Sequence, residues 1–363
     1  MPVSAFHKTR GVVLMYELPA KVRGFKPYDP ITGYYKIRLD ANESYVDIND
    51  YIEGGVAGVA AKVAYNRYPD AAAAKLCSTI AKSFGLNERY ITTGNGSDEL
   101  ISIITSVLLE KGQTVLTSEP DFSMYRFYPS VYELGVESVQ KNDALEINVD
   151  ELLAKANAIN AGMIIFSNPC NPTSTGLCRE EVLRIVENAP GLVVVDEAYM
   201  DFWDQSILDV AADYDNLIVL KTCSKALGCA AMRIGFAVAG ERITDVLRAV
   251  KSPYNTDSFS QELATALLSR EGIVEELSGL MIESRKELYA EIVKLAEKKS
   301  EILKVYPSKT NFVFMKMKDS RSVHKKLLER SIAIRCFDGY LRITAGKAEE
   351  NEAVIKALEE VLE

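Results

Sequence analysis

Three apolar segments in the middle of the chain each run directly into a short polar cluster. They are GMIIFSNP, GLVVVDEAY and NLIVLKTCS, which begin at residues 162, 191 and 216. Stretches of helical length separate them, and this spacing is typical of strand–helix–strand units. Strands that are apolar along their whole length belong in a parallel sheet that is covered on both faces. The sequence therefore predicts an α/β fold built around a mostly parallel sheet.

Two earlier segments, RYITTGNGS and QTVLTSEP, extend this pattern toward the N-terminus. Ligands of such sheets bind beyond the carboxyl ends of the strands. We therefore expect one edge of the sheet to gather five polar clusters, which are GNGSDE, EPDF, SNPCNPTSTG, DEAY and TCSKA.

The last third of the chain has a different pattern. Residues 258–300 predict one or two long helices around Gly272, and three short strands and a closing helix follow them. This order favours a smaller α+β domain. The organisation that we expect is an arm over 1–50 that packs on the small domain, a large domain over 51–254, and the small domain over 255–363.

The composition excludes several classes of protein. The formal net charge is −9, from 42 basic and 51 acidic side chains, unlike the basic surface of a nucleic-acid-binding protein. No apolar run approaches a membrane span, and GVVLMY is too short for a signal-peptide core. The six cysteines have no paired spacing, and the two histidines lie far apart. We therefore expect a cytoplasmic protein without a metal site and without nucleic-acid or membrane partners.

Each polar cluster also has an ordinary structural explanation. Ser97 in GNGSDE could cap a helix, although free backbone N–H groups at a helix start also bind anions. The prolines of SNPCNPTSTG could stiffen a turn, or they could hold the amide of Asn171 in place. Asp196 could pair with an arginine, and Lys225 could be a solvated surface lysine.

Taken together, the clusters match one cofactor. They supply an anion cradle at Gly96 and Ser97, an aromatic ring, an amide, a carboxylate, a phenol, and a lysine followed eight residues later by Arg233. Pyridoxal phosphate has a phosphate, a flat ring, a 3′ oxygen, a ring nitrogen and an aldehyde that forms a Schiff base with a lysine. Burial favours the neutral, nucleophilic form of a lysine. The order of these groups predicts a site for this cofactor.

The chain resembles the fold-type-I pyridoxal-phosphate-dependent aminotransferases, in the histidinol-phosphate aminotransferase-like branch. The resemblance extends from VRGFKPY to AEENEAVIKAL, which is nearly the whole chain. It implies a large domain with a mostly parallel central sheet and a smaller α+β domain. The motifs that carry it are LDANES, NRYPD, GNGSDELI, PDFSMY, SNPCNPTSTG, VVVDEAY, TCSKALGCAAMRIGF, PYN, YPSKTNFVF and LRITAG.

This resemblance implies a role for each residue of the cofactor site. Lys225 would form the Schiff base and shuttle the proton, and Asp196 would keep the ring nitrogen protonated. Asn171 and Tyr199 would bind the 3′ oxygen, and Phe122 would stack on the ring. The implied phosphate ligands are Gly96, Ser97, Asp98 through its backbone, Ser224 and Arg233.

The resemblance also implies a shared, dimeric site and a substrate pocket. Tyr68 in NRYPD matches a tyrosine that reaches the phosphate from the partner subunit of a homodimer. Arg342 matches the arginine that binds the substrate carboxylate in a bidentate fork. Asn42 belongs to the implied substrate site, together with Tyr28 and Arg335, which would read a substrate phosphate.

The leading substrates are histidinol phosphate as amino donor and 2-oxoglutarate as 2-oxo acid acceptor, in histidine biosynthesis. The chain departs from the family in NESYVDI, where the family has NENP-G, and in the short link CFDGYL between Arg335 and Arg342. An aromatic or other amino-acid aminotransferase and a threonine-phosphate decarboxylase-like enzyme stay open as alternatives. A sensor domain of a transcription regulator would carry an N-terminal DNA-binding domain, which we do not expect here because the chain is acidic and has 36 residues before IRLDANES.

Overall fold

The computed structural model describes residues 16–27 and 30–362. Residues 31–363 form one compact unit, and residues 1–30 form a separate one. Within that first unit, Ala20–Val22 forms a 3-10 turn. Tyr28, which the sequence places in the substrate pocket, lies outside the described residues.

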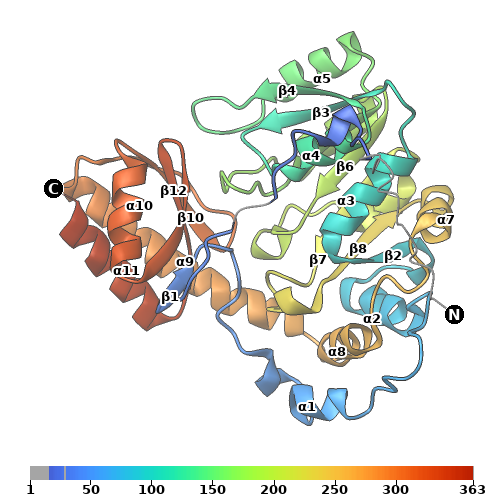
Figure 1. Ribbon diagram of the computed structural model, residues 1–363, viewed down its shortest axis with the longest axis horizontal. Coiled ribbons are helices and arrows are strands. Elements are labelled where there is room, and N and C mark those ends of the chain that lie inside the picture. Colours follow the sequence, from blue (N-terminus) through green and yellow to red (C-terminus); the bar gives the residue numbers. More distant parts are fainter. Residues whose placement is uncertain (1–15, 28–29, 363) are drawn as a thin grey trace, which may run out of the picture. The chain divides into compact units, whose positions relative to one another are not determined.

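A seven-stranded sheet forms the centre of the large domain, in the order β2–β8–β7–β6–β5–β3–β4 (Figure 1). Neighbouring strands run parallel except at β8, which is antiparallel to both β2 and β7. This confirms the predicted α/β fold with a mostly parallel sheet. The strands are β2 (Ile91–Asn95), β3 (Thr114–Glu119), β4 (Gly135–Gln140), β5 (Met163–Ser167), β6 (Leu192–Asp196), β7 (Leu217–Thr222) and β8 (Ile234–Ala239).

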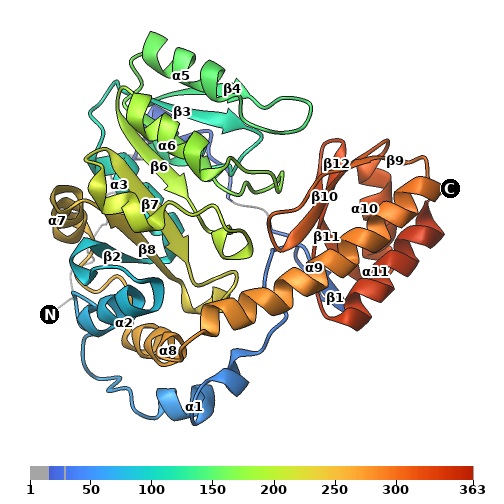
Figure 2. The same ribbon diagram turned by 180° about the vertical axis from the view of Figure 1, so that it is seen from behind.

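Helices cover both faces of this sheet (Figures 1 and 2). Successive residues of β6 enter opposite cores, Val193 and Val195 on one side and Val194 on the other. The strand is apolar throughout because both of its faces are buried. One face is covered by α3 (Gly96–Val107), α4 (Met124–Val131) and α7 (Glu241–Val250), and the other by α2 (Ala74–Phe84), α5 (Val149–Ala158), α6 (Arg179–Asn188) and α8 (Ser258–Leu268).

A second sheet of five strands, in the order β1–β11–β12–β10–β9, forms the small domain. β1 runs parallel to β11, and the other neighbours are antiparallel. Its strands are β1 (Ile37–Leu39), β9 (Ile302–Val305), β10 (Phe312–Met317), β11 (Ile332–Phe337) and β12 (Tyr340–Thr344). One face packs on the later turns of α9 (Ile273–Lys298), on α10 (Ser320–Glu329) and on α11 (Ala348–Val361).

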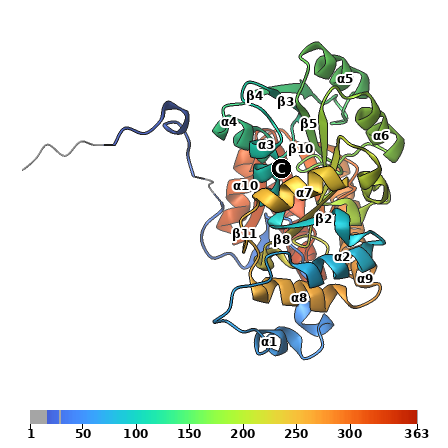
Figure 3. The same cartoon turned by 90° about the vertical axis from the view of Figure 1, so that its right-hand side faces the viewer.

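Core packing moves two of the predicted domain boundaries. α8 and the first turns of α9 belong to the large core, through residues such as Leu267 and Leu277. The chain therefore passes from one core to the other within α9 and not at residue 255. Among the described residues of the predicted arm, β1 joins the small sheet, whereas Val46 and Ile48 pack against the large core. α1 (Gly55–Ala60) follows in the predicted large domain. α2 and α8 lie side by side there (Figure 3).

Gly272 separates two helices, where the sequence predicted one or two. Its φ of 72° lies in the left-handed region, which glycine adopts without strain, so α8 ends at Leu268 and α9 begins directly after the glycine. Among the described residues, no helix has the length and apolarity that a membrane crossing requires.

Candidate active site

The sheet brings the predicted polar clusters to one edge. β5, β6 and β7 are parallel neighbours, and Ser167 at the end of β5 is in register with Asp196 at the end of β6. β7 ends at Thr222, which opens TCSKA. In the pairing of β2 with β8, Gly94 lies opposite Gly235. GNGSDE therefore lies beside Arg233, which is two residues before that glycine. The gathering of these clusters follows from strand order.

A cradle for an anion lies at the start of α3. Gly96 has a φ of 77°, and a Cβ built on it would overlap the guanidinium of Arg233. A Cβ on Gly235 would likewise overlap the backbone nitrogen of Ser97. Arg233 donates from Nη1 to Ser224 Oγ at 3.3 Å. Backbone N–H groups at a helix start, a hydroxyl and a guanidinium together form a site for a phosphate.

The start of α3 differs from the predicted cap. The helix begins at Gly96, and the N-cap residue is Asn95, so Ser97 lies in the first turn. The reason is local, because the backbone N–H of Asn95 donates to the Glu99 carboxylate at 2.6 Å. The backbone N–H of Ser97 is therefore one of the first-turn N–H groups that have no acceptor within the helix. Burial raises the pKa of the neighbouring Asp98.

Asp196 is 4% exposed and is held by two donors. The phenol of Tyr125 donates to Oδ2 at 2.8 Å, and the backbone N–H of Ala198 donates to Oδ1 at 3.0 Å. Burial raises the pKa of Asp196 to about 6, although these two hydrogen bonds act to lower it. The ring of Tyr125 packs edge-on against that of Phe122, with the ring centroids 5.5 Å apart. Sequence reasoning missed Tyr125, and its place three residues after Phe122 in PDFSMY was the only signal.

Asn42 contacts Tyr199 across 157 positions of the chain. Its Nδ2 donates to the phenolic oxygen at 2.8 Å. Two small-domain residues fix it, because the Asn42 N–H donates to Thr344 Oγ1 at 3.0 Å and its carbonyl accepts from Asn311 Nδ2 at 3.1 Å. Asn42 has a φ of 54°, which asparagine tolerates better than most residues. Asn42, which the sequence predicts in the substrate site, therefore contacts the phenol of Tyr199, which is predicted to be catalytic.

The two residues before Asn42 contact the other predicted catalytic and substrate groups. Arg342 donates from Nη2 to the carbonyl of Asp40 at 2.6 Å. Lys225 donates from Nζ to the carbonyl of Ala41 at 3.1 Å. Segment 40–42 thus contacts, through consecutive residues, the arginine, the lysine and the phenol.

Arg342 is 6% exposed and lies between aromatic rings of the small sheet. Its guanidinium carbon lies 5.2 Å from the Phe312 ring centroid and 5.7 Å from that of Phe337. It also donates to Asn171 Oδ1, which turns the amide NH2 of Asn171 away from the arginine. Arg335 is the cross-strand partner of Arg342.

Tyr68 is not brought into this group by its own chain. Its side chain is 80% exposed, and its ring stacks on that of Tyr254 with centroids 4.5 Å apart. An exposed stacked pair of this kind is typical of surfaces that meet another protein.

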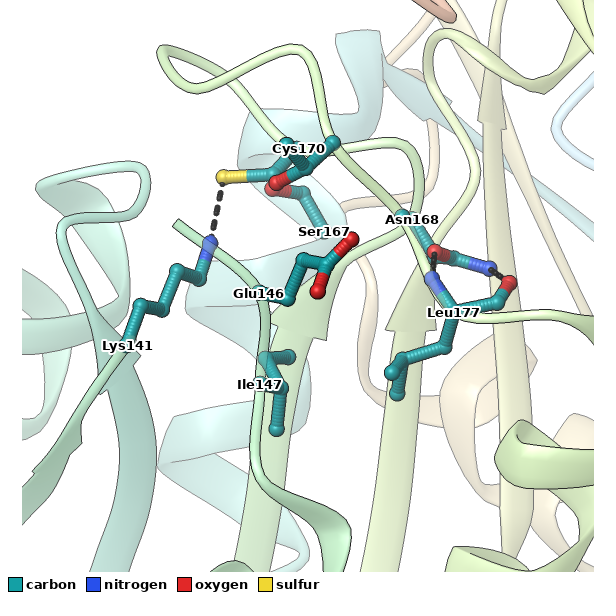
Figure 4. A pocket seen from close by; sticks show the side chains of 9 residues that line it. Lys141, Glu146, Ile147, Ser167, Asn168, Cys170 and Leu177 are labelled. Atoms are coloured by element: carbon teal, nitrogen blue, oxygen red, sulfur yellow. Dashed lines mark hydrogen bonds between the residues drawn. The ribbon is translucent and has the colours of Figure 1, made fainter. Parts of the chain in front are cut away.

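A buried polar cluster supports the turn that carries Asn171, and Figure 4 shows its residues Lys141, Ser167 and Cys170. Asp121 accepts hydrogen bonds from the hydroxyl of Ser167 and from the backbone N–H of Phe122. Lys141 donates to Cys170 Sγ at 2.8 Å and lies 3.8 Å from Asp121. Burial raises the pKa of Cys170, and the ammonium of Lys141 opposes that shift. Nothing in the spacing of the sequence links Lys141 to this turn.

These residues fit pyridoxal phosphate in the donor set that they present. The cradle that glycine leaves open at Gly96 and Gly235 suits the phosphate, and the buried carboxylate of Asp196 suits a protonated ring nitrogen. Tyr199 and Lys225 are adjacent, with Nζ 5.8 Å from the ring centroid.

Comparisons with known proteins agree with this geometry. The family model for aminotransferase class I and II matches residues 35–358. The chain is 39% identical to the histidinol-phosphate aminotransferase of Clostridium kluyveri over 343 residues, 93% of this chain and 96% of the relative.

Two solved structures share the fold. The histidinol-phosphate aminotransferase from Sinorhizobium meliloti in complex with pyridoxal-5′-phosphate has a TM-score of 0.86 at 22% identity, over 97% of this chain and 99% of that one. The L-threonine-O-3-phosphate decarboxylase from Porphyromonas gingivalis has a TM-score of 0.76 at 22% identity, over 89% and 98%. The fold alone therefore does not separate transamination from decarboxylation.

Proposed function

Because this chain belongs to the class I and II family of pyridoxal-phosphate-dependent aminotransferases, we propose that it transfers the amino group of histidinol phosphate to 2-oxoglutarate, in histidine biosynthesis. The observation that carries this proposal is the placement of two arginines. β11 and β12 form a hairpin whose turn is Asp338–Gly339, and its register sets Arg335 directly opposite Arg342. Residues that are directly opposite project from the same face of a sheet.

This register supports the proposal although the link CFDGYL is short. In the hairpin, Arg335 is the cross-strand neighbour of Arg342 without a longer loop. The core-facing neighbours Ile334 and Leu341 alternate with the two arginines, which fixes the arginines on the other face. Two guanidinium groups on one face suit a substrate pair in which one member carries a phosphate and the other carries carboxylates.

The residues of the site then divide the chemical work. When bound, pyridoxal phosphate supplies a carbonyl that accepts an amine and a ring that takes up the electrons of a broken Cα–H bond. Lys225 Nζ takes the Cα proton and returns it on the other side of the transfer. Asp196 holds a proton at the ring nitrogen. Arg342 binds the anionic group of either substrate and so fixes the orientation of the Cα–H bond.

Asn42 sets the direction of the hydrogen bond made by Tyr199. The phenolic oxygen accepts from the Asn42 amide, so its own proton is left to be donated to the 3′ oxygen of the cofactor. With the cofactor bound, a hydrogen bond donated by Tyr199 would stabilise negative charge on that oxygen and so would lower the pH at which the lysine-linked cofactor titrates.

Replacing Asn42 by glycine is expected to raise the pH midpoint of the absorbance change of the lysine-linked cofactor. Glycine keeps the left-handed φ and removes only the amide. The loss of one hydrogen bond in the network, about 1 kcal/mol, corresponds to roughly half to one pH unit. The control is the same change in a Tyr199→Phe background, where no further shift is expected. An equal shift in both backgrounds would mean that Asn42 acts by a route other than the phenol.

Replacing Arg335 by alanine is expected to reduce kcat/KM for histidinol phosphate by about ten- to a hundredfold, since a charge-assisted hydrogen bond contributes roughly 1.5–3 kcal/mol. The effect on glutamate should be much smaller. The control is Arg321→Ala, which removes an 80% exposed positive charge paired with Asp338 in the hairpin turn.

A panel of amino donors tests the proposed substrate in the unmodified enzyme. Each donor is scored by conversion of the cofactor to its amine form and by assay for released CO2. Histidinol phosphate should be the best donor, without CO2. Far better conversion of phenylalanine or tyrosine supports the aromatic aminotransferase alternative, and CO2 release from a phosphorylated amino acid supports the decarboxylase.

We further propose a homodimer in which Tyr68 completes the site of the partner subunit. Mixing Lys225→Ala chains with Tyr68→Ala chains should restore partial activity, because one of the two sites in each hybrid dimer would be intact. The matched control mixes Lys225→Ala chains with Asp196→Ala chains. Each of these substitutions damages the site of the chain that carries it, so neither site of the hybrid dimer is intact. Failure of the first mixture after verified subunit exchange would place Tyr68 in the site of its own chain.

A further inference from the structure

Lys141, Cys170 and Asp121 form a buried cluster, and the chemistry proposed above uses neither the lysine nor the cysteine. Lys141 follows β4, and Cys170 lies in the turn after β5 (Figure 4). The side chains of Lys141 and Asp121 are 1% and 2% exposed, and Cys170 is 2% exposed. A buried ammonium that faces a sulfur atom more closely than it faces its carboxylate is an unusual arrangement, because buried charges normally pair directly.

The distance between the two reactive atoms is short. Lys141 Nζ lies 2.8 Å from Cys170 Sγ. This separation is within the range of an N–H···O hydrogen bond, about 2.7–3.2 Å, although sulfur is a larger atom than oxygen. One oxygen atom bonded to both sulfur and nitrogen fits this spacing with little movement of either side chain. A direct sulfur–nitrogen bond would need a much closer approach.

We propose that Lys141 and Cys170 are a redox modification site, at which dioxygen joins them through a covalent sulfur–oxygen–nitrogen bridge. The S–H bond and one N–H bond break, and an S–O bond and an O–N bond form. Sulfur and nitrogen each lose two electrons, and dioxygen gains four. The second oxygen atom takes the two hydrogens and leaves as one molecule of water, so atoms and electrons balance.

The surroundings supply what this step needs. The lysine must give up a proton before its nitrogen can bond to oxygen, and the carboxylate of Asp121 lies 3.8 Å from Nζ to receive it. A small pocket is lined by Lys141, Cys170, Ser167 and Gly176, among others (Figure 4). It gives a molecule as small as dioxygen a place beside the sulfur.

The bridge would join two segments that support the active site. It links the end of β4 to the turn between Ser167 and Asn171, and Asn171 accepts a hydrogen bond from Arg342. A covalent link between residues 141 and 170 closes a loop in the unfolded chain and so stabilises the folded one. A thiol reductant should reverse the link, as it reverses the lower oxidation states of cysteine.

Intact-protein mass spectrometry tests this inference without depending on any activity. Air-exposed wild-type protein is expected to weigh about 14 Da more than reduced protein, from one oxygen gained and two hydrogens lost. Digestion should yield one peptide pair that joins residues 141 and 170. Dithiothreitol should remove the added mass and lower the Tm.

Matched variants test whether the added mass requires both Cys170 and Lys141. Cys170→Ser, which is nearly isosteric, should show neither the mass gain nor the Tm difference, and Lys141→Met should show no joined peptides. Cys178→Ser, at a partly exposed cysteine elsewhere, should keep both. The inference is overturned if air and peroxide leave the mass unchanged. It is equally overturned if the added oxygen maps to Cys170 without the lysine, or if about 2 Da is lost, which would indicate a direct sulfur–nitrogen bond.

Discussion

Replacing Lys225 by alanine is expected to abolish repeated turnover, with kcat reduced by roughly 10⁵-fold or more, as when a residue central to the chemistry is removed. Alanine has no amine to carry the Cα proton and none to form the covalent link to the cofactor. The absorbance of the lysine-linked cofactor should disappear, although the cradle at Gly96 can still bind the phosphate.

A Lys225→Arg variant is the matched control, because it keeps the positive charge near the carbonyl of Ala41 but offers neither a nucleophile nor a base at neutral pH. It should be as inactive as Lys225→Ala. Substantial repeated turnover in either folded variant would contradict the assignment of the proton transfer to this lysine.

Replacing Asp196 by asparagine is expected to lower kcat by about a hundred- to a thousandfold, the usual effect of removing one electrostatic stabiliser from an active site. Asparagine has nearly the same shape and can still accept from Ala198. It cannot hold a proton at the ring nitrogen, so the ring takes up electrons less readily. Steady-state kinetics with saturating cofactor measures the effect, and a nearly normal rate in the folded variant would refute the role.

The same variant should have the opposite effect on the stability of cofactor-free protein. Burial raises the pKa of Asp196 from 3.8 to about 6, so the folded state favours the protonated form. The stability that this group contributes is present in full below pH 3.8 and is lost as the pH rises through 6. Above pH 6 the buried carboxylate costs of the order of 3 kcal/mol relative to a neutral group.

Asp196→Asn should therefore raise the Tm of cofactor-free protein at pH 8, and by less at pH 5. With cofactor bound, the gain should shrink or reverse, because the wild-type carboxylate would then pair with the ring nitrogen, as proposed above. Thermal unfolding of both proteins, with and without cofactor at the two pH values, makes the comparison. A variant that is less stable without cofactor at pH 8 would contradict the burial argument.

Among the strands predicted for the large sheet, the clearest were three whose two faces are both buried. β5, β6 and β7 are apolar throughout, and that pattern has few other interpretations. β4 and β8 were not predicted. β4 is an edge strand in which only Val139 is buried, so its sequence GVESVQ carries a weak signal. β8 begins directly after Arg233, inside the motif TCSKALGCAAMRIGF that carries the proposed cofactor residues.

The gathering of the residues proposed for the cofactor was predictable because they lie at the ends of successive strands. The contacts of Asn42 with Tyr199 were not, since they join positions 157 residues apart and depend on the docking of the small domain. The cross-strand pairing of Arg335 with Arg342 could have been predicted from the sequence. The Asp338–Gly339 dipeptide between two apolar segments is a strong hairpin signal, and a two-residue turn fixes the register.

The most direct test of the central claim is to reduce the cofactor-loaded enzyme with borohydride and to map the pyridoxyl label by peptide mass spectrometry. The account predicts a single label on Lys225, in the peptide that contains TCSKALG. Lys141 and Lys221 are also buried, and both lie near the same edge of the sheet. A label on either of them, or on any other lysine, would contradict the site described here.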